Sequence, residues 1–140
     1  NDIAEPRIID FGYARPFHQS SKSFSREGLN LNYVATECFN NLYSPQSDLF
    51  SVGAVIYHLL FGRPPWFKDI SKYKSDRTKA GDVISEVRKK PLDFPKISSG
   101  ILDFEESIVK VIKKSVHQDP DRRFQSADEF SQALNGESER

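Results

Sequence analysis

One segment of the sequence, residues 45–61, constrains the fold more than any other. Its apolar side chains cover most of the circumference of a helix: Leu49, Phe50, Val52, Val55, Ile56, Leu59 and Leu60. Ser44 suits the N-cap, Pro45 suits the first helical position, and Gly62 suits the C-terminal stop. A helix that is apolar nearly all round is buried on most sides. We therefore expect this helix to be the central one of the domain.

The remaining periodic segments predict three shorter helices. Apolar spacing places them near 82–90, from about 104 to 117, and from about 127 to 134. Capping boxes predict where the last two begin, at Asp103 with Glu106 and at Ser126 with Glu129. We expect Phe130 and Leu134 to face inward from the last helix.

The N-terminal part of the chain differs in character from the rest. Residues 6–9 predict a short strand, and the polar, aperiodic residues 16–32 predict a surface loop. The fold class is therefore mainly α, with a short strand region at the N-terminus. We find no linker that would divide the chain into two domains.

Composition narrows the classes of partner and compartment. Lys plus Arg and Asp plus Glu number 20 each, so net charge favours neither nucleic acid nor a membrane surface. The single cysteine, Cys38, excludes an internal disulfide framework and fits a reducing compartment. No signal peptide is visible at the start, and we expect a cytoplasmic protein. The chain has no methionine, so we expect Asn1 to be an artificial boundary, a processing site or the start of a cleaved piece.

The first motif that carries chemistry is Ile8-Ile9-Asp10-Phe11-Gly12. A carboxylate at the end of a strand, beside a glycine that permits an unusual turn, can hold Mg²⁺ against nucleotide phosphates. A plain strand-to-turn junction, with Asp10 accepting backbone hydrogen bonds, explains the same residues. Taken alone, the motif favours this second interpretation, because short motifs have many false positives.

Further motifs follow in a fixed order along the chain. They are Tyr33-Val34-Ala35-Thr36-Glu37, Ser47-Asp48-Leu49-Phe50-Ser51-Val52-Gly53, Gly62-Arg63-Pro64-Pro65 and Asp119-Pro120-Asp121-Arg122-Arg123. With Asp-Phe-Gly before them, this series resembles the C-terminal part of a protein-kinase catalytic domain of the Ser/Thr type. That family carries Asp-Phe-Gly, an activation segment, Ala-Pro-Glu, a helix opening with Ser-Asp, and later Asp-Pro-(any)-(any)-Arg. The resemblance covers essentially the whole chain.

The resemblance implies a division of the chain and a nucleotide site. Residues 1–37 would hold the Asp-Phe-Gly motif and activation segment, 38–136 the helical subdomain of the large lobe, and 137–140 a tail. Asp10 would bind Mg²⁺, and Asp10, Phe11 and Gly12 would contact the bound ATP and metal in the intact parent. Phe11 matches the residue whose packing marks active and inactive states. We expect neither cofactor bound to this chain alone.

The resemblance also implies a structural clamp. Glu37 matches a glutamate that pairs with a buried arginine, and Arg123 matches that arginine. A planar guanidinium can hold a carboxylate through two hydrogen bonds. Asp48 matches a buried aspartate that accepts backbone hydrogen bonds from the catalytic loop, although a first-turn acid is also favoured by the helix dipole.

The groups that perform phosphoryl transfer are missing from this chain. It has no Gly-rich phosphate loop, no strand lysine and no His-Arg-Asp catalytic loop with its asparagine. Transfer depends on positioning and charge stabilisation by those groups, so we expect no catalytic residue and no activity from this chain alone. Thr36 stands where the family has proline, and Phe50 where it has tryptophan. Tyr33 and Thr36 would face the substrate, in a divergent site.

Four serines fall in the predicted activation segment: Ser20, Ser21, Ser23 and Ser25. Regulatory phosphorylation often occurs in this part of kinases, and the phosphate then needs an arginine partner. A solvated serine-rich loop explains the same residues without modification.

Three interpretations of the whole chain remain. The first is a fragment of a Ser/Thr-type kinase whose parent transfers the ATP γ-phosphate to protein hydroxyls. The second is a pseudokinase-like binding module, or half of a split protein completed by a partner chain. Across these first two interpretations, the expected partners of the chain are a protein substrate, the missing N-terminal part of the kinase domain, or a second copy of the chain. The third is an unrelated small helical domain.

Overall fold

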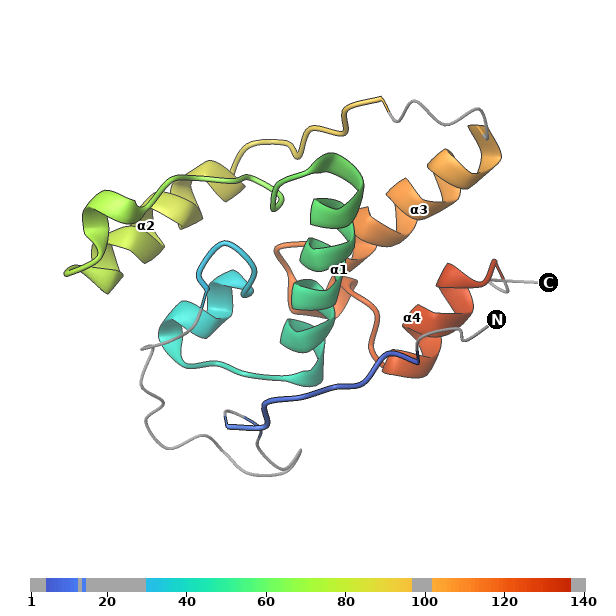
Figure 1. Ribbon diagram of the computed structural model, residues 1–140, viewed down its shortest axis with the longest axis horizontal. Coiled ribbons are helices and arrows are strands. Elements are labelled where there is room, and N and C mark those ends of the chain that lie inside the picture. The colour runs from blue at the N-terminus through green and yellow to red at the C-terminus, as the bar shows by residue number, and fades with distance from the viewer. Residues whose placement is uncertain (1–4, 13, 15–29, 97–101, 137–140) are drawn as a thin grey trace.

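The computed structural model describes residues 5–12, 14, 30–96 and 102–136, and within these it is helical (Figure 1). The elements are, in chain order, η1 (Thr36–Asn40), α1 (Pro45–Phe61), η2 (Ser71–Tyr73), α2 (Arg77–Arg88), α3 (Leu102–Ser115), η3 (Pro120–Arg122) and α4 (Ala127–Leu134). The described residues contain no β-strand, and the mainly helical prediction is confirmed. None of their helices is both long and apolar enough to cross a bilayer.

Helix α1 begins and ends where the sequence predicts. The Ser44 hydroxyl accepts a hydrogen bond from the backbone N–H of Ser47 at 3.2 Å. The Ser47 hydroxyl in turn accepts one from the Ser44 N–H at 2.7 Å, so the two serines form a reciprocal cap. At the other end Gly62 adopts the left-handed conformation, with φ of 80°, and its N–H donates to the carbonyl of His58.

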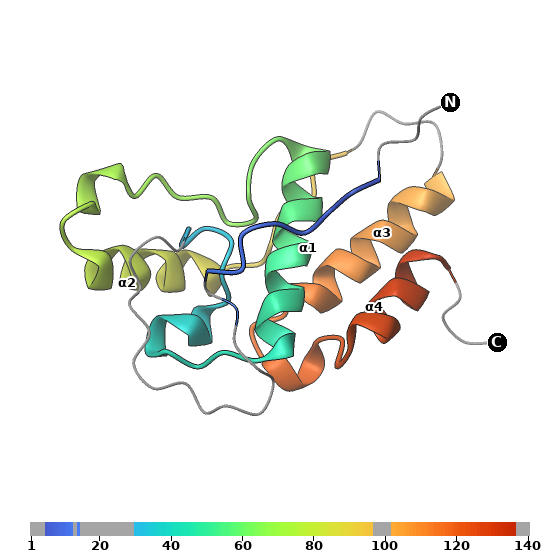
Figure 2. The ribbon, with the colours of Figure 1, turned by 60° about the horizontal axis from the view of Figure 1, so that its bottom comes forward.

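The largest core lies between α1 and α3, which pack against each other. Phe50 from α1 and Ile112 from α3 are fully buried there. Helix α4 packs on α3, and α2 lies on the opposite side of α1 (Figure 2). A second cluster joins α2 to the chain around η1 through Leu31, Phe39 and Ile84.

One face of α1 is exposed, and the prediction that this helix is buried on most sides is wrong for that face. Val52 is 42% exposed, Val55 46% and Leu59 79%. These positions are three and four residues apart, so they lie along one side of the helix. The apolar pattern indicates a surface that can be covered, but among the described residues nothing covers it.

The other element predictions differ in detail from the structure. Helix α2 begins at Arg77, earlier than predicted, because the Asp76 carboxylate caps it by accepting from the N–H of Lys79 at 2.9 Å. Helix α3 is displaced by two residues at each end from the predicted range. The predicted capping box at Asp103 lies outside the described side chains.

Helix α4 has the predicted bounds, and its capping box is only half formed. The Ser126 hydroxyl accepts from the N–H of Glu129, whose carboxylate accepts from the N–H of Gln125 and not from that of Ser126. Phe130 is buried as predicted. The prediction that Leu134 faces inward is wrong, since its side chain is 41% exposed at the end of the helix.

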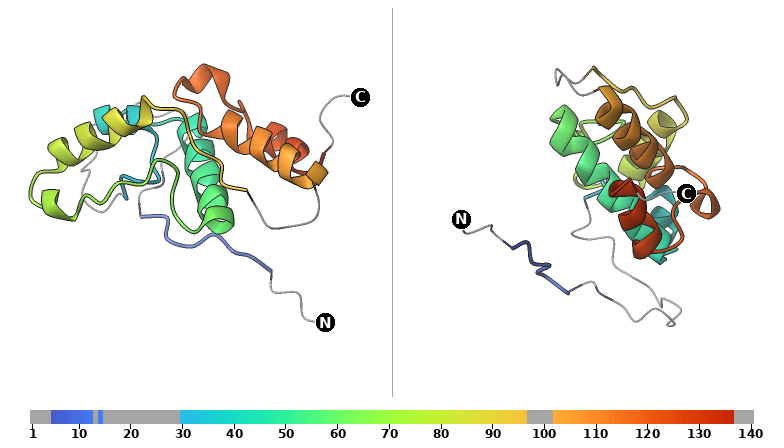
Figure 3. Two further views of the ribbon diagram at one scale, coloured as in Figure 1. Left: turned by 90° about the horizontal axis from the view of Figure 1, so that it is seen from above. Right: turned by 90° about the vertical axis from the view of Figure 1, so that its right-hand side faces the viewer.

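Residues 5–12 run outside the helical body (Figure 3) and have no regular secondary structure. The strand predicted for residues 6–9 is not formed there, because a strand needs a neighbour to pair with and none lies beside it among the described residues. Ile8 and Ile9 are accordingly more than 80% exposed, at 84% and 81%.

The α1–α3 packing generates a prediction at Gly53. A Cβ added there would lie 2.5 Å from the Cβ of Ser115 on α3, so the two helices would have to separate. We expect Gly53→Ala to lower the free energy of unfolding by about 1–3 kcal/mol, although alanine is the better helix former. Urea denaturation followed by circular dichroism measures this change.

Gly81→Ala is the matched control. Gly81 also lies inside a helix, but an added Cβ would meet Phe39 at 3.4 Å, an ordinary contact. We expect this variant to be unchanged or more stable by up to about 1 kcal/mol. Equal effects of the two substitutions would contradict a close approach at Gly53.

Candidate functional site

Glu37 and Arg123 form a two-pronged ion pair near the start of α1. Nη1 of Arg123 donates to Oε1 of Glu37 at 2.6 Å, and Nη2 donates to Oε2 at 3.0 Å. The arginine is 1% exposed and the glutamate side chain 15%. The pair joins η1 to the residue that follows η3, 86 positions later in the chain.

The other donors of Arg123 are used as well. Its Nε donates to the carbonyl of His117 at 2.6 Å, and its Nη groups also donate to the carbonyls of Gln46 and Gln118. The guanidinium lies 4.9 Å from the centre of the Phe50 ring. All five N–H donors of Arg123 therefore have a hydrogen-bond acceptor, and these bonds offset the cost of removing the charge from water.

A second buried arginine, Arg88, organises the turn before η1. It is the last residue of α2 and is 3% exposed. Its Nη groups donate to the carbonyls of Val34 at 2.7 Å, Leu31 at 3.2 Å and Asn32 at 3.4 Å. Nη1 also donates to the hydroxyl of Thr36 at 3.1 Å. Burial lowers the pKa of Arg88 to about 10, which leaves the side chain charged at neutral pH.

Sequence reasoning missed Arg88. It stands among Lys89 and Lys90 at the end of an amphipathic helix, where a basic residue is expected for the helix dipole alone. The one available signal was Thr36 in place of the family's proline, because a hydroxyl at that position can accept a hydrogen bond and proline has no such group. The structure brings the two together.

The two residues expected to face the substrate differ in their surroundings. The Thr36 hydroxyl donates to Oε1 of Gln118 at 3.2 Å, and it is half-buried between that residue and Arg88. Tyr33 lies 2.5 Å, hydroxyl to Nδ1, from His58 of α1, and it lines a pocket. Side chains from α1 and α2, which are distant in the sequence, therefore hold Tyr33 and Thr36 in place.

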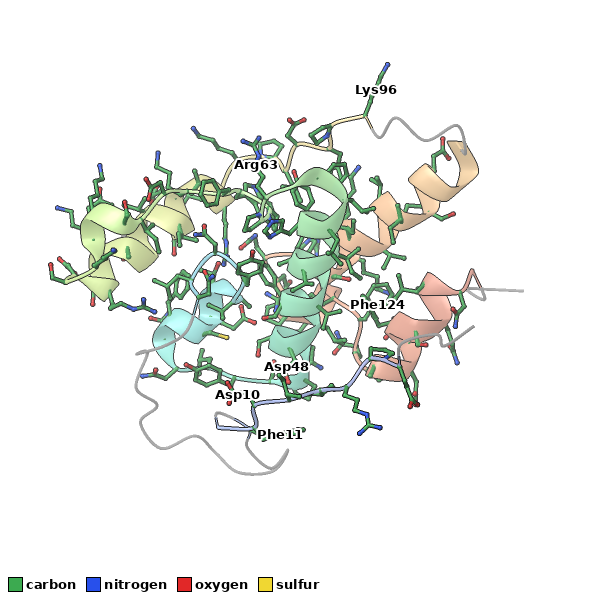
Figure 4. The ribbon with its side chains drawn as sticks, viewed as in Figure 1. Asp10, Phe11, Asp48, Arg63, Lys96 and Phe124 are labelled. Atoms are coloured by element: carbon green, nitrogen blue, oxygen red, sulfur yellow. The ribbon has the colours of Figure 1, made fainter. Side chains whose placement is uncertain are left out.

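Asp10, Phe11 and Gly12 are exposed, and Asp10 and Phe11 lie at the lower edge of the view in Figure 4. Asp10 has a φ of 62°, and its carboxylate accepts the N–H of Gly12 at 3.3 Å. Phe11 is 67% exposed, and its carbonyl accepts from the N–H of Ala14. This is the geometry of a self-contained turn. Nowhere in the described residues do three or more potential metal ligands gather.

Asp48 is exposed at the first turn of α1, and its carboxylate makes no hydrogen bond to a described residue. It therefore does not take part in the clamp, where the resemblance placed it. Partial desolvation raises the pKa of this carboxyl above its ordinary value.

Two further groups of residues that carry reactive side chains are Cys38 and the serines of the predicted activation segment. Cys38 is buried, and burial raises the pKa of its thiol to about 11, so it is neutral and unsuited to act as a nucleophile. The four serines from Ser20 to Ser25 lie outside the described residues, and their phosphorylation stays a prediction.

The sequence of this chain is similar to those of known proteins. The family model described as protein kinase domain matches residues 2–135. Calcium-dependent protein kinase 12 of Oryza sativa subsp. japonica is 29% identical over 134 residues, which is 96% of this chain and 22% of that protein. A probable myosin light chain kinase of Dictyostelium discoideum is 30% identical over 118 residues, 84% of this chain and 22% of that protein. The chain thus spans about a fifth of the length of these relatives.

The ion pair generates a prediction at Glu37. We expect Glu37→Ala to lower the free energy of unfolding by about 3–5 kcal/mol, because it leaves the buried charge of Arg123 without a partner. Chemical denaturation measures the change. Glu86→Ala is the control, since the Lys89–Glu86 pair has both side chains 70% exposed and should cost less than about 1 kcal/mol. A loss at Glu37 as small as that at Glu86 would contradict the clamp.

Arg88 generates a second prediction at this site. We expect Arg88→Met to lower the free energy of unfolding by about 1–3 kcal/mol, because several carbonyls of the 31–36 segment lose their donor. Amide hydrogen exchange should accelerate in residues 31–36 and stay unchanged in α3. Lys89→Met, at the exposed neighbouring position, should alter neither measurement. Unchanged exchange in the 31–36 segment of the Arg88→Met variant would show that the arginine does not hold it.

Proposed function

Since the chain belongs to the protein kinase domain family, we propose that it is the C-terminal part of the large lobe of a Ser/Thr-type kinase. The intact parent would transfer the γ-phosphate of ATP to protein hydroxyls, and this chain would be inactive alone. The observation that carries the proposal is the Glu37–Arg123 ion pair, which lies where the resemblance requires it. It fixes the end of the activation segment to the helical body, and so supports a surface built to receive a substrate.

The groups that the chain contains decide which part of the parent's site it would supply. In the parent, Asp10 would be one ligand of Mg²⁺, and the ion would supply neutralisation of charge on the ATP phosphates. Asp10 offers a single exposed carboxylate, which is too few ligands to hold that ion by itself. The described residues therefore do not fit a complete nucleotide site, and we assign no step of the reaction to them. Their contribution would be the substrate-facing segment around Tyr33 and Thr36, held by Arg88.

The exposed face of α1 supports the idea that this lobe is incomplete. Val52, Val55 and Leu59 present apolar surface on the helix that carries Asp48 at its start. Apolar side chains along one face of a central helix favour burial against another part of the same protein or against a partner. The same face supports the alternative function, a binding module that captures a partner or a second copy of the chain.

A chimera tests the proposal. We expect the purified chain to transfer no label from γ-labelled ATP with Mg²⁺ to a mixed protein substrate. The upstream part of the rice relative's kinase domain, joined to this chain just before Asp10, should restore transfer. Asp10→Asn in the chimera should abolish it, because the metal would lose a charged ligand, while the exposed Asp128→Asn should not.

Transfer by the chain alone would contradict the proposed inactivity. A folded chimera that binds ATP but transfers nothing would favour the binding module. Sedimentation velocity then separates the two forms of that alternative, because only self-association depends on the concentration of the chain itself.

A further inference from the structure

A pocket of about 410 Å³ lies between the turn before η1 and the C-terminal end of α1. Its lining comes from three places: Asn30, Asn32 and Tyr33 of the turn, His58 of α1, and Gly62, Arg63, Pro64 and Phe67 of the segment after the helix. The volume is in the range of about 300–1,000 Å³ that small-ligand sites occupy. We propose that this pocket binds an anionic side chain of an extended peptide, either a carboxylate or a phosphorylated hydroxyl.

The charge of the lining favours an anion. Arg63 is exposed at the rim, and it forms no ion pair or hydrogen bond with a described residue. The lining contains neither Asp nor Glu, so no carboxylate of the pocket itself repels an anion. An arginine binds a carboxylate or phosphate through two parallel N–H donors, which gives both strength and orientation.

The polar lining residues add donors that suit the same ligand. Asn30 is exposed and carries a side-chain amide. His58 uses its Nδ1 toward Tyr33, and its ring lies against the tyrosine ring at 5.9 Å between centres. Phe67, 49% exposed, supplies an apolar wall against which the methylene groups of a peptide side chain can pack.

The walls of the pocket are held in place without a ligand. The Asn32 side chain donates to the carbonyl of Lys68 and accepts from the N–H of Lys68, both at 3.2 Å. These two bonds fix the turn to the segment after α1, and the Tyr33–His58 hydrogen bond fixes it to the helix itself. Binding to a preformed site loses less free energy to the ordering of side chains.

The peptide nature of the ligand rests on the proposed function, because Tyr33 belongs to the substrate-facing segment. Binding itself needs no phosphoryl transfer, so it can be measured directly on this chain. A chimera that fails to transfer phosphate would leave the binding result standing, and a pocket that fails to bind would leave transfer untouched. The two proposals therefore fail separately.

The test uses fluorescence anisotropy with three labelled nonapeptides that differ only at the central residue, which is glutamate, phosphoserine or glutamine. We expect the glutamate or the phosphoserine peptide to bind at least about tenfold more tightly than the glutamine peptide, since a charge-assisted pair is lost. The stronger of the two anionic peptides identifies the source of the anion. Binding should weaken as salt is raised.

Two variants locate the binding. Arg63→Gln should weaken the anionic peptide about tenfold and leave the glutamine peptide unchanged. Lys96→Gln removes the same charge from another exposed residue, which is not part of the pocket lining and lies on the segment leading to α3, apart from Arg63 in Figure 4, and should have little effect. Circular dichroism confirms that both variants are folded.

Three results would overturn the proposal. They are equal affinity for the glutamine and anionic peptides, equal losses from Arg63→Gln and Lys96→Gln, and no binding of any peptide by the folded chain at millimolar concentration. The second of these would reduce the effect to the overall charge of the chain.

Discussion

The described structure depends on two buried arginines that lie against one aromatic ring. Arg88 and Arg123 are both almost fully buried, and each guanidinium lies 4.9 Å from the centre of the Phe50 ring. Glu37 pairs with Arg123 directly, and its charge also favours the charged form of Arg88, whereas the charge of Arg123 disfavours it. A single negative group thus offsets two desolvated cations. This arrangement ties η1, α1, α2 and the segment after α3 around one aromatic ring.

Phe50 explains why the arrangement is possible. An aromatic face attracts a cation, and the interaction strengthens where water is excluded. Phe50 is fully buried, so its ring can offer this attraction to the guanidinium groups of both arginines. The remaining cost is met by hydrogen bonds to carbonyl groups, which use every donor of Arg123 and leave only Nε of Arg88 without a partner. In this part of the core, the buried arginines therefore depend both on the aromatic ring and on the hydrogen bonds to carbonyl groups.

The sequence could predict those features that depend on neighbouring residues. The bounds of α1 follow from Ser44 and Gly62, and the start of α4 follows from Ser126, because caps act within one turn. The contacts of Arg88 reach over 50 residues back along the chain, and no local pattern distinguishes it from the lysines beside it. The exposed face of α1 was unpredictable for another reason. Apolar spacing indicates which residues can be buried, but whether anything covers them depends on the rest of the protein.

The 30–36 segment and the Asp10 turn differ in how many other parts of the chain hold them in place. The 30–36 segment is fixed by side chains from α1, α2 and the chain beyond α3, so its shape is determined by the described residues themselves. The bonds described for Asp10 and Phe11 lie within their own turn, and Asp48 has no hydrogen-bonding partner among the described residues. Catalysis by positioned charges requires groups held in place by a surrounding shell. The chain meets this requirement around Tyr33 and Thr36 and not around Asp10, which is why we propose recognition of a partner, and no catalytic step, for its own residues.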